Sequence, residues 1–219
     1  MKYRSKQNKM ILAASGLALC SVLWGEDPAC CKSPPPPPPQ MSCCKTSMDK
    51  AESHTSNSLF NVESLWETEK GEVVPLSRLG TRLHLVAMVY TSCQYACPRI
   101  ISDLKVIESG IGIEDTSRYG ICLVTIDPKR DTVAVYNDYA VKRGLEKERW
   151  SFLRGKSGDI LELANLLGVR YKELPDGDFS HSNIITLLDS DGEIVYQLNG
   201  LEADPSELIE KAKELLDPA

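Results

Sequence analysis

Two apolar runs of strand length lie in the globular part of the chain, which begins at about residue 58. The first is "LHLVAMVY" at 83–90, and the second is "RYGICLVTID" at 118–127. Runs that are rich in Leu, Ile and Val, without regular polar alternation, are typical of strands buried on both faces of a sheet. We therefore predict that these two segments form the centre of a sheet.

Four further segments carry apolar residues at the three- and four-residue spacing of amphipathic helices. They cover 99–110, 132–144, 158–168 and 204–216. Asp131 and Asp204 stand where helix N-caps are expected, with Pro205 at the first helical position of the last helix. Gly110 and Gly144 stand where the first two helices should end.

The segment 182–198 predicts a β-hairpin, because two apolar runs flank an Asp191-Gly192 turn. The expected order is then strand, helix, strand, helix, helix, hairpin and helix. A βαβ unit followed by an antiparallel hairpin and a closing helix is the arrangement of the thioredoxin-like fold. We therefore expect an α/β domain over 58–219, with a central mixed sheet and flanking helices.

Residues 1–25 have the layout of an export segment. A basic stretch without acidic residues runs into 15 residues of low charge, "MILAASGLALCSVLW", which is shorter than the ~20 residues of a membrane span. A cleaved signal peptide, an uncleaved membrane anchor and lipidation of Cys20 are three open interpretations. All three place the rest of the chain outside the cytoplasmic face.

Residues 26–57 are predicted to be a linker, because they combine six consecutive prolines, 34–39, with short polar stretches. The prolines favour a polyproline II spacer of about 19 Å, at about 3.1 Å per residue, which would hold the domain off a membrane. Two pairs of adjacent cysteines flank the spacer: Cys30 with Cys31, and Cys43 with Cys44. Soft thiolates suit Cu(I), so a copper-collecting tail is one interpretation, and a disordered tail with incidental thiols is the other.

The composition excludes two broad classes of protein. Without residues 1–25 the chain keeps 21 basic residues against 31 acidic ones. An acidic body does not attract a phosphate backbone, so we exclude nucleic-acid binding. Five of the eight cysteines lie in the first 44 residues, which leaves too few in the body for a scaffold held together by disulfides.

Cys93 and Cys97 lie where the first strand turns into a helix. If Cys93 begins that helix, four residues at about 1.5 Å rise place the two Cα atoms about 6 Å apart, within the ~4.4–6.8 Å that a disulfide tolerates. A helix N-terminus also favours the thiolate, which is the reactive and metal-binding form of cysteine. The residues thus leave a redox pair, a metal site and two structural thiols open.

Histidine supplies the candidate third ligand. His54 lies in the linker, and His84 lies within the first strand, where we expect a hydrogen-bonded structural role. His181 lies in a polar loop before the hairpin, and in a thioredoxin-like fold that loop faces the turn that carries the cysteines. Two thiolates and an imidazole form a soft site that suits Cu(I) and adapts to Cu(II) with one further ligand, whereas zinc would require a fourth ligand.

Three motifs, in order along the chain, resemble the SCO/SenC family of copper-handling assembly factors of cytochrome c oxidase. They are "YTSCQYACP", "TIDPKRDT" and "SHSNIITLLDSDGE". The resemblance implies a membrane-tethered thioredoxin-like domain that binds one copper ion through Cys93, Cys97 and His181. Asp127 and Asp131 match the D-x-x-x-D pair of the family, for which a structural role in a turn and a helix cap is one interpretation. Tuning of the copper site or partner recognition is the other.

The function implied by the resemblance is that of a copper chaperone which assists metallation of the binuclear copper centre of cytochrome c oxidase. The expected partners are the copper-bearing oxidase subunit, other copper carriers and, through the N-terminus, the membrane, on the periplasmic side of the bacterial inner membrane. A thiol-disulfide oxidoreductase that uses Cys93 and Cys97 to keep the oxidase cysteines reduced is the alternative, and peroxide reduction is a weaker one. Gln94 stands where the family commonly has proline, which leaves the redox potential of the pair open. We expect Cys122, in the second strand, to be an inert buried thiol.

Overall fold

The computed structural model describes residues 54–79, 82–145 and 148–217. The export segment, the proline spacer and the five cysteines of the N-terminal part lie outside the described residues. The strands are β1 (Leu65–Thr68), β2 (Val73–Pro75), β3 (Leu83–Val89), β4 (Tyr119–Thr125), β5 (Trp150–Arg154), β6 (Tyr171–Glu173), β7 (Phe179–His181), β8 (Ile184–Leu188) and β9 (Ile194–Asn199). The helices are η1 (Leu59–Asn61), η2 (Leu76–Leu79), α1 (Ala96–Ile111), α2 (Val133–Arg143), α3 (Ser157–Leu166) and α4 (Ser206–Leu216), of which η1 and η2 are 3-10 helices.

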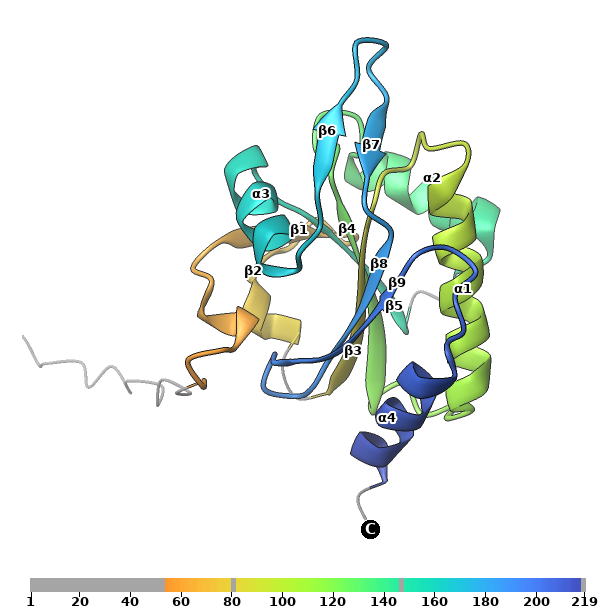
Figure 1. The fold of residues 1–219 in the computed structure, drawn as a ribbon. Coiled ribbons are helices and arrows are strands. Elements are labelled where there is room, and N and C mark those ends of the chain that lie inside the picture. Colours follow the sequence, from red (N-terminus) through yellow and green to blue (C-terminus); the bar gives the residue numbers. More distant parts are fainter. Residues whose placement is uncertain (1–53, 80–81, 146–147, 218–219) are drawn as a thin grey trace, which may run out of the picture. The chain divides into compact units, whose positions relative to one another are not determined.

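A mixed sheet of seven strands, in the order β2-β1-β5-β4-β3-β8-β9, forms the centre of the described part. β3, β4 and β5 are parallel neighbours. β8 and β9 continue the sheet antiparallel on one side, and β1 and β2 do so on the other. β6 and β7 form a separate two-stranded sheet, which projects beyond one end of the main sheet (Figure 1).

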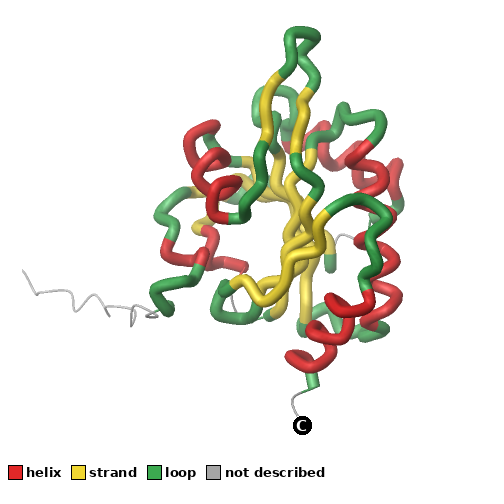
Figure 2. Tube along the Cα trace, in the orientation of Figure 1, coloured by secondary structure: helices red, strands yellow, loops and turns green. Residues whose placement is uncertain are grey.

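Helices cover both faces of the main sheet. α1, α2 and α4 lie on one side and α3 lies on the other, as Figures 1 and 2 show. The expected thioredoxin-like architecture, a central mixed sheet with flanking helices, is confirmed.

The two central strands are buried along their whole length, as their apolar runs predicted. All seven residues of β3 and all seven of β4 are buried. Full burial of one large aliphatic side chain stabilises a fold by about 1.5–3 kcal/mol, so these strands are the rigid frame of the domain. The loops that leave their ends therefore begin from fixed positions.

The first helix begins after Cys93, which we took as its first residue when we estimated the distance between the two cysteines, and before residue 99, where the apolar spacing begins. α1 begins at Ala96, so Cys93 lies in the turn before the helix and Cys97 lies in its first turn. The helix also extends past Gly110 and ends at Gly112, whose φ of 70° is the left-handed conformation of a C-cap.

Two expected caps differ from those in the structure. Thr132, and not Asp131, caps α2, because its side chain accepts the N–H of Val135. α4 begins at Ser206 with Pro205 at the N-cap position, although the Asp204 carboxylate still accepts the N–H of Ser206 over 3.0 Å. The predicted end of α2 at Gly144 is confirmed.

The hydrophobic pattern missed five strands. β1, β2, β6 and β7 are three or four residues long and partly exposed, so their segments carry no apolar run. β5 has only five residues and a mixed burial pattern. Pairing with neighbouring strands, which the local sequence does not record, makes these segments extended.

Candidate metal centre

The loop that follows β3 carries both motif cysteines. The N–H of Tyr90 donates to Cys97 Sγ over 3.4 Å, and the N–H of Cys97 donates to Cys93 Sγ over 3.3 Å. Both thiols are buried, with exposed fractions of 6% for Cys93 and 0% for Cys97. Backbone donors thus hold the two sulfurs together and favour their ionised forms.

His181 is the last residue of β7, and not part of a loop as expected. Tyr171 of β6 is its partner across the two-stranded sheet. The ring of Tyr90 meets the imidazole edge-on, with the centroids 5.8 Å apart, and the Tyr90 hydroxyl donates to Asp178 over 2.5 Å. Tyr90 therefore contacts both the cysteine loop and the strand that carries the histidine.

Cys93, Cys97 and His181 bring three ligand atoms together. These atoms all lie within 4.8 Å of one another, and Cys97 Sγ is 3.7 Å from His181 Nε2. Sulfur and nitrogen ligands that share a metal ion at about 2.0–2.3 Å lie at most about 4.6 Å apart, so small side-chain movements suffice to enclose one ion. Among the described residues, 54–79, 82–145 and 148–217, this is the one group of three or more candidate ligands that could hold a metal ion.

The imidazole presents its lone pair to the sulfurs. His181 Nδ1 lies 3.0 Å from the carbonyl oxygen of Ser182. A carbonyl can only accept, so Nδ1 carries the ring hydrogen and Nε2 is left as the acceptor. This backbone contact is the kind that fixes the tautomer and orientation of metal-binding histidines.

The two thiols differ in protonation. The hydrogen bond with the Cys97 side chain lowers the pKa of Cys93 well below the usual thiol value, and the N–H of Cys97 acts in the same direction. The same contact with Cys93, and then burial, raise the pKa of Cys97. At neutral pH Cys93 is thus a thiolate and Cys97 keeps its proton, which it must release when a metal binds.

Asp131 holds the start of the cysteine loop. Its buried carboxylate accepts the N–H of Thr91 over 3.0 Å, the hydroxyl of Thr91 over 2.5 Å and the hydroxyl of Thr125 over 2.6 Å. Burial raises the pKa of this carboxyl. Because Thr91 lies two residues before Cys93, Asp131 positions the loop and does not touch the ligand atoms.

Asp127 acts through Arg130 on the part of the centre that carries His181. The buried carboxylate of Asp127 forms an ion pair with Arg130. Arg130 Nη2 donates to the carbonyl oxygen of Gly177 over 2.6 Å, and its guanidinium lies 5.6 Å from the centroid of the Phe179 ring. Gly177 and Phe179 belong to the β6–β7 hairpin that carries His181, so this ion pair fastens the hairpin to the domain.

The structure separates the remaining candidates from the centre. Cys122 is fully buried in β4, as expected, and burial raises its pKa to about 12. His54 packs against Phe60, and His84 lies in β3. Sequence reasoning missed Arg130, although it lies inside the D-x-x-x-D motif, because nothing in the sequence reveals that Gly177 lies beside it.

Comparison with known proteins identifies the family in which this arrangement of residues occurs. The family model described as SCO1/SenC matches residues 57–217. The chain belongs to the SCO1/SenC family. The match includes both motif cysteines, the two aspartates and His181, and so spans every residue of the candidate metal centre.

Individual SCO1/SenC relatives are distant in sequence and alike in fold. A SCO1 protein homolog of Bacillus subtilis is 22% identical over 143 residues, which are 64% of this chain and 74% of the relative. Copper-bound ScoI of Bradyrhizobium japonicum matches with a TM-score of 0.59 and 25% identity, covering 69% of this chain and 96% of that one. BsSco is a member of the Sco family of cytochrome c oxidase assembly proteins, and a disulfide switch was identified in it. It matches with a TM-score of 0.62 and 20% identity, covering 77% of this chain and 100% of that one.

Among the residues that the structure describes in this SCO1/SenC chain, no helix has both the length and the apolar character that a bilayer crossing requires.

Proposed function

We propose that this SCO1/SenC protein is a copper chaperone. It binds one copper ion through Cys93, Cys97 and His181 and passes it by ligand exchange to the binuclear copper centre of cytochrome c oxidase. The observation that carries the proposal is the approach of two Sγ atoms and one Nε2 to within 4.8 Å of one another. Two thiolates with an imidazole suit Cu(I), and a further ligand adapts them to Cu(II).

The partner and the location belong to the same proposal. The copper-bearing subunit of the oxidase receives the ion, another copper carrier supplies it, and the N-terminal segment holds the domain at the periplasmic side of the membrane. Membership of BsSco in a family of oxidase assembly proteins supports the partner. The export layout of residues 1–25, and a SCO1/SenC lipoprotein of Bacillus anthracis among the similar structures, support the location.

The unequal protonation of the two cysteines favours a second function, thiol-disulfide exchange. The Cys93 thiolate attacks one sulfur of a partner disulfide and releases the other as a thiolate. Cys97, after losing its proton, then attacks Cys93 in the mixed disulfide and frees the second partner sulfur. The partner disulfide is thus reduced to two thiols while Cys93 and Cys97 are oxidised to a disulfide.

Replacement of His181 separates the two functions. His181→Ala removes one of three metal ligands but leaves both thiols, so copper affinity should fall by about tenfold or more and the Cu(II) absorption spectrum should change. The rate of disulfide exchange should change much less. Copper titration of the reduced full chain and a disulfide reduction assay measure the two quantities.

His54→Ala is the matched control, because His54 lies outside the donor group, and it should alter neither quantity. A copper affinity and Cu(II) spectrum that survive His181→Ala unchanged would contradict the carrier function. Exchange that persists after Cys93→Ser would contradict the oxidoreductase function.

A further inference from the structure

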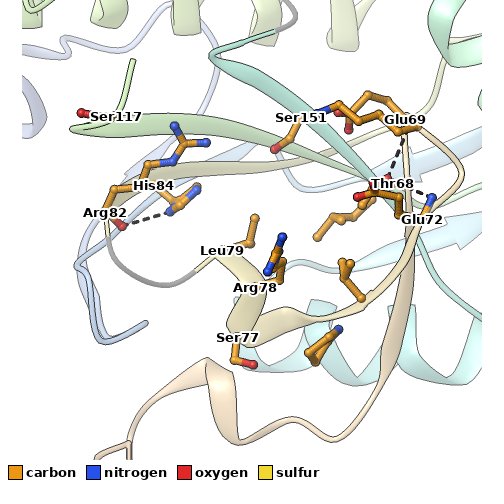
Figure 3. Close-up of a pocket in the computed structure, with 14 residues that line it drawn as sticks. Thr68, Glu69, Glu72, Ser77, Arg78, Leu79, Arg82, His84, Ser117 and Ser151 are labelled. Atoms are coloured by element: carbon orange, nitrogen blue, oxygen red, sulfur yellow. Dashed lines mark hydrogen bonds between the residues drawn. The ribbon is translucent and has the colours of Figure 1, made fainter. Parts of the chain in front are cut away.

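A pocket of about 620 Å³ lies between the β1–β2 turn, η2 and the main sheet (Figure 3). His84 of β3 and Ser151 and Leu153 of β5 contribute its sheet side. None of the three ligands of the candidate metal centre lines it. The proposed function therefore leaves this pocket unused.

His84 presents an unpaired acceptor at this pocket. Its side chain is buried, with 1% exposed, and its Nδ1 lies 3.1 Å from the carbonyl oxygen of Arg82. Since that carbonyl accepts, Nδ1 carries the ring hydrogen and Nε2 is a lone-pair acceptor. Nε2 has no hydrogen-bond partner among the described residues, so the expected hydrogen-bonded role holds for one ring nitrogen only. Buried acceptors without a donor are rare in folded proteins.

The imidazole is neutral at physiological pH. Burial, and then the positive charge of Arg82, lower the pKa of His84 to about 4. Protonation at Nε2 is therefore disfavoured, and this nitrogen can only accept a hydrogen bond from whatever group lies against it.

Arg82 places a positive charge beside that acceptor. Its Nη1 donates to the carbonyl oxygen of Thr116, and no described acidic residue forms an ion pair with it. A Cβ atom on Gly120 would lie 3.0 Å from Arg82 Nη2 and 3.0 Å from His84 Nε2. Arg82 and His84 therefore both pack closely against the backbone of a glycine, where any larger residue would press on them.

The pocket has a basic end and an acidic end. Figure 3 shows Arg82 and His84 on one side and Glu69 and Glu72 on the other, with Arg78 between them. Glu69 already accepts the N–H of Phe152 over 3.2 Å. Although the chain has a net charge of -6, both acidic residues that line the pocket lie away from Arg82, and Arg78 adds a second positive charge next to that end.

We propose that this basic end binds a small oxyanion that carries a hydroxyl hydrogen. Arg82, with Arg78, donates to the charged oxygens, and the hydroxyl of the anion donates to the lone pair of His84 Nε2. Phosphate-type anions carry such a hydrogen at neutral pH, whereas sulfate has the same shape and none to donate. A site with a buried acceptor rejects the anion that leaves this acceptor unpaired.

The test compares inorganic phosphate with sulfate. Calorimetric titration of the full chain at neutral pH, in a buffer without other oxyanions, should show phosphate binding at least about tenfold more tightly than sulfate. The ¹⁵N signal of His84 Nε2 should shift with phosphate and not with sulfate. Arg82→Gln should weaken the binding of both anions by about tenfold, since it removes the charge-assisted hydrogen bonds.

His84→Leu should lower the phosphate affinity to the level of sulfate and leave sulfate binding unchanged. Arg170→Gln is the matched control, because it removes an exposed arginine that does not line the pocket, and it should change neither affinity. Thermal melting checks the fold of each variant; if His84→Leu does not fold, Arg82→Gln and the anion comparison still decide. Equal affinity for the two anions, or phosphate binding that survives Arg82→Gln, overturns the proposal, and neither result depends on copper.

Discussion

Cys93 and Cys97 differ in their readiness to ionise, because their surroundings lower the pKa of one thiol and raise that of the other. Cys93 accepts hydrogen bonds at the mouth of the site, where Thr91 and Gln94 line an open groove beside it. Cys97 is fully enclosed. An incoming disulfide or metal ion therefore meets the Cys93 thiolate first.

Alkylation should reveal this difference. Cys93 in the reduced, copper-free chain should react with iodoacetamide at a rate that changes little between about pH 8 and pH 5, because its lowered pKa keeps it ionised throughout. In Cys97→Ala the main hydrogen bond is lost, so the pKa of Cys93 should rise and the reaction at about pH 5 should slow by about tenfold or more. Mass spectrometry of peptides after timed quenching measures each site.

Cys122→Ala is the control, since Cys122 is buried with a raised pKa and should contribute nothing to the reaction. A Cys93 rate that falls about tenfold for each pH unit below about 8.5, as for an ordinary thiol, would contradict the assignment.

The β6–β7 hairpin is the element that brings the histidine to the cysteines. A two-stranded sheet has little stability by itself, so contacts with the rest of the domain must hold it. Arg130 provides one set of contacts, with Gly177 and Phe179. Tyr90 provides the other, with Asp178. The motif aspartate Asp127 therefore affects His181 without touching it.

Arg130→Met tests this connection. The variant keeps an apolar stem over Phe179 but loses the ion pair and the hydrogen bond to Gly177, so copper affinity should fall by about threefold to tenfold. The His181 ring signals should broaden, because the hairpin is less firmly held, while alkylation of Cys93 should be unchanged. Copper titration and NMR of the imidazole measure these effects.

Arg143→Met is the matched control, since Arg143 also lies over an aromatic ring, that of Tyr139, and has no contact with the hairpin. Sharp His181 signals and normal copper affinity in Arg130→Met would show that the hairpin does not depend on this arginine.

At the scale of the whole molecule, the topology of the sheet assembles the centre. β3 and β4 are parallel, so the cysteine loop and the Asp127–Asp131 loop leave the same edge of the sheet. β8 is antiparallel to β3, so the segment that enters it, with His181, arrives at that edge as well. Three motifs that are far apart in the sequence meet for this reason.

The sequence was sufficient to predict the elements and residues with strong local signals. The buried central strands, the amphipathic helices and the meeting of Cys93, Cys97 and His181 were all expected. The anchoring of Thr91 by Asp131 and the tasks of Arg130 and Tyr90 were not, because they depend on contacts between segments that are 40 to 90 residues apart in the chain. The strand position of His181 was not expected either, because it follows from the pairing of β7 with the short strand β6. The unpaired Nε2 of His84 is likewise a property of packing.

Removal of residues 26–57 tests where copper binds. The deleted chain should keep one copper site with unchanged affinity, because all three proposed ligands lie in the described part. Equilibrium dialysis against a Cu(I) competitor measures both the number of sites and the affinity. Complete loss of binding would mean that the tail cysteines form the main site.

The full-length chain with Ser at Cys30, Cys31, Cys43 and Cys44 is the matched comparison, since it removes the tail thiols without shortening the chain. It should bind the same single copper ion, and any additional copper bound by the unmodified chain is then assigned to the tail.

The placement of His181 on a small projecting hairpin also has a consequence for the release of cargo. Two ligands lie on the turn and helix that directly follow the buried strand β3, and the third lies on a hairpin that pairs with no strand of the main sheet. Any conformational entropy that the hairpin loses when it closes on an ion is subtracted from the affinity of the site. On the proposed function, a carrier built in this way would hold its ion less tightly than a rigid site with the same three ligands, and it would open one ligand at a time when a recipient approaches.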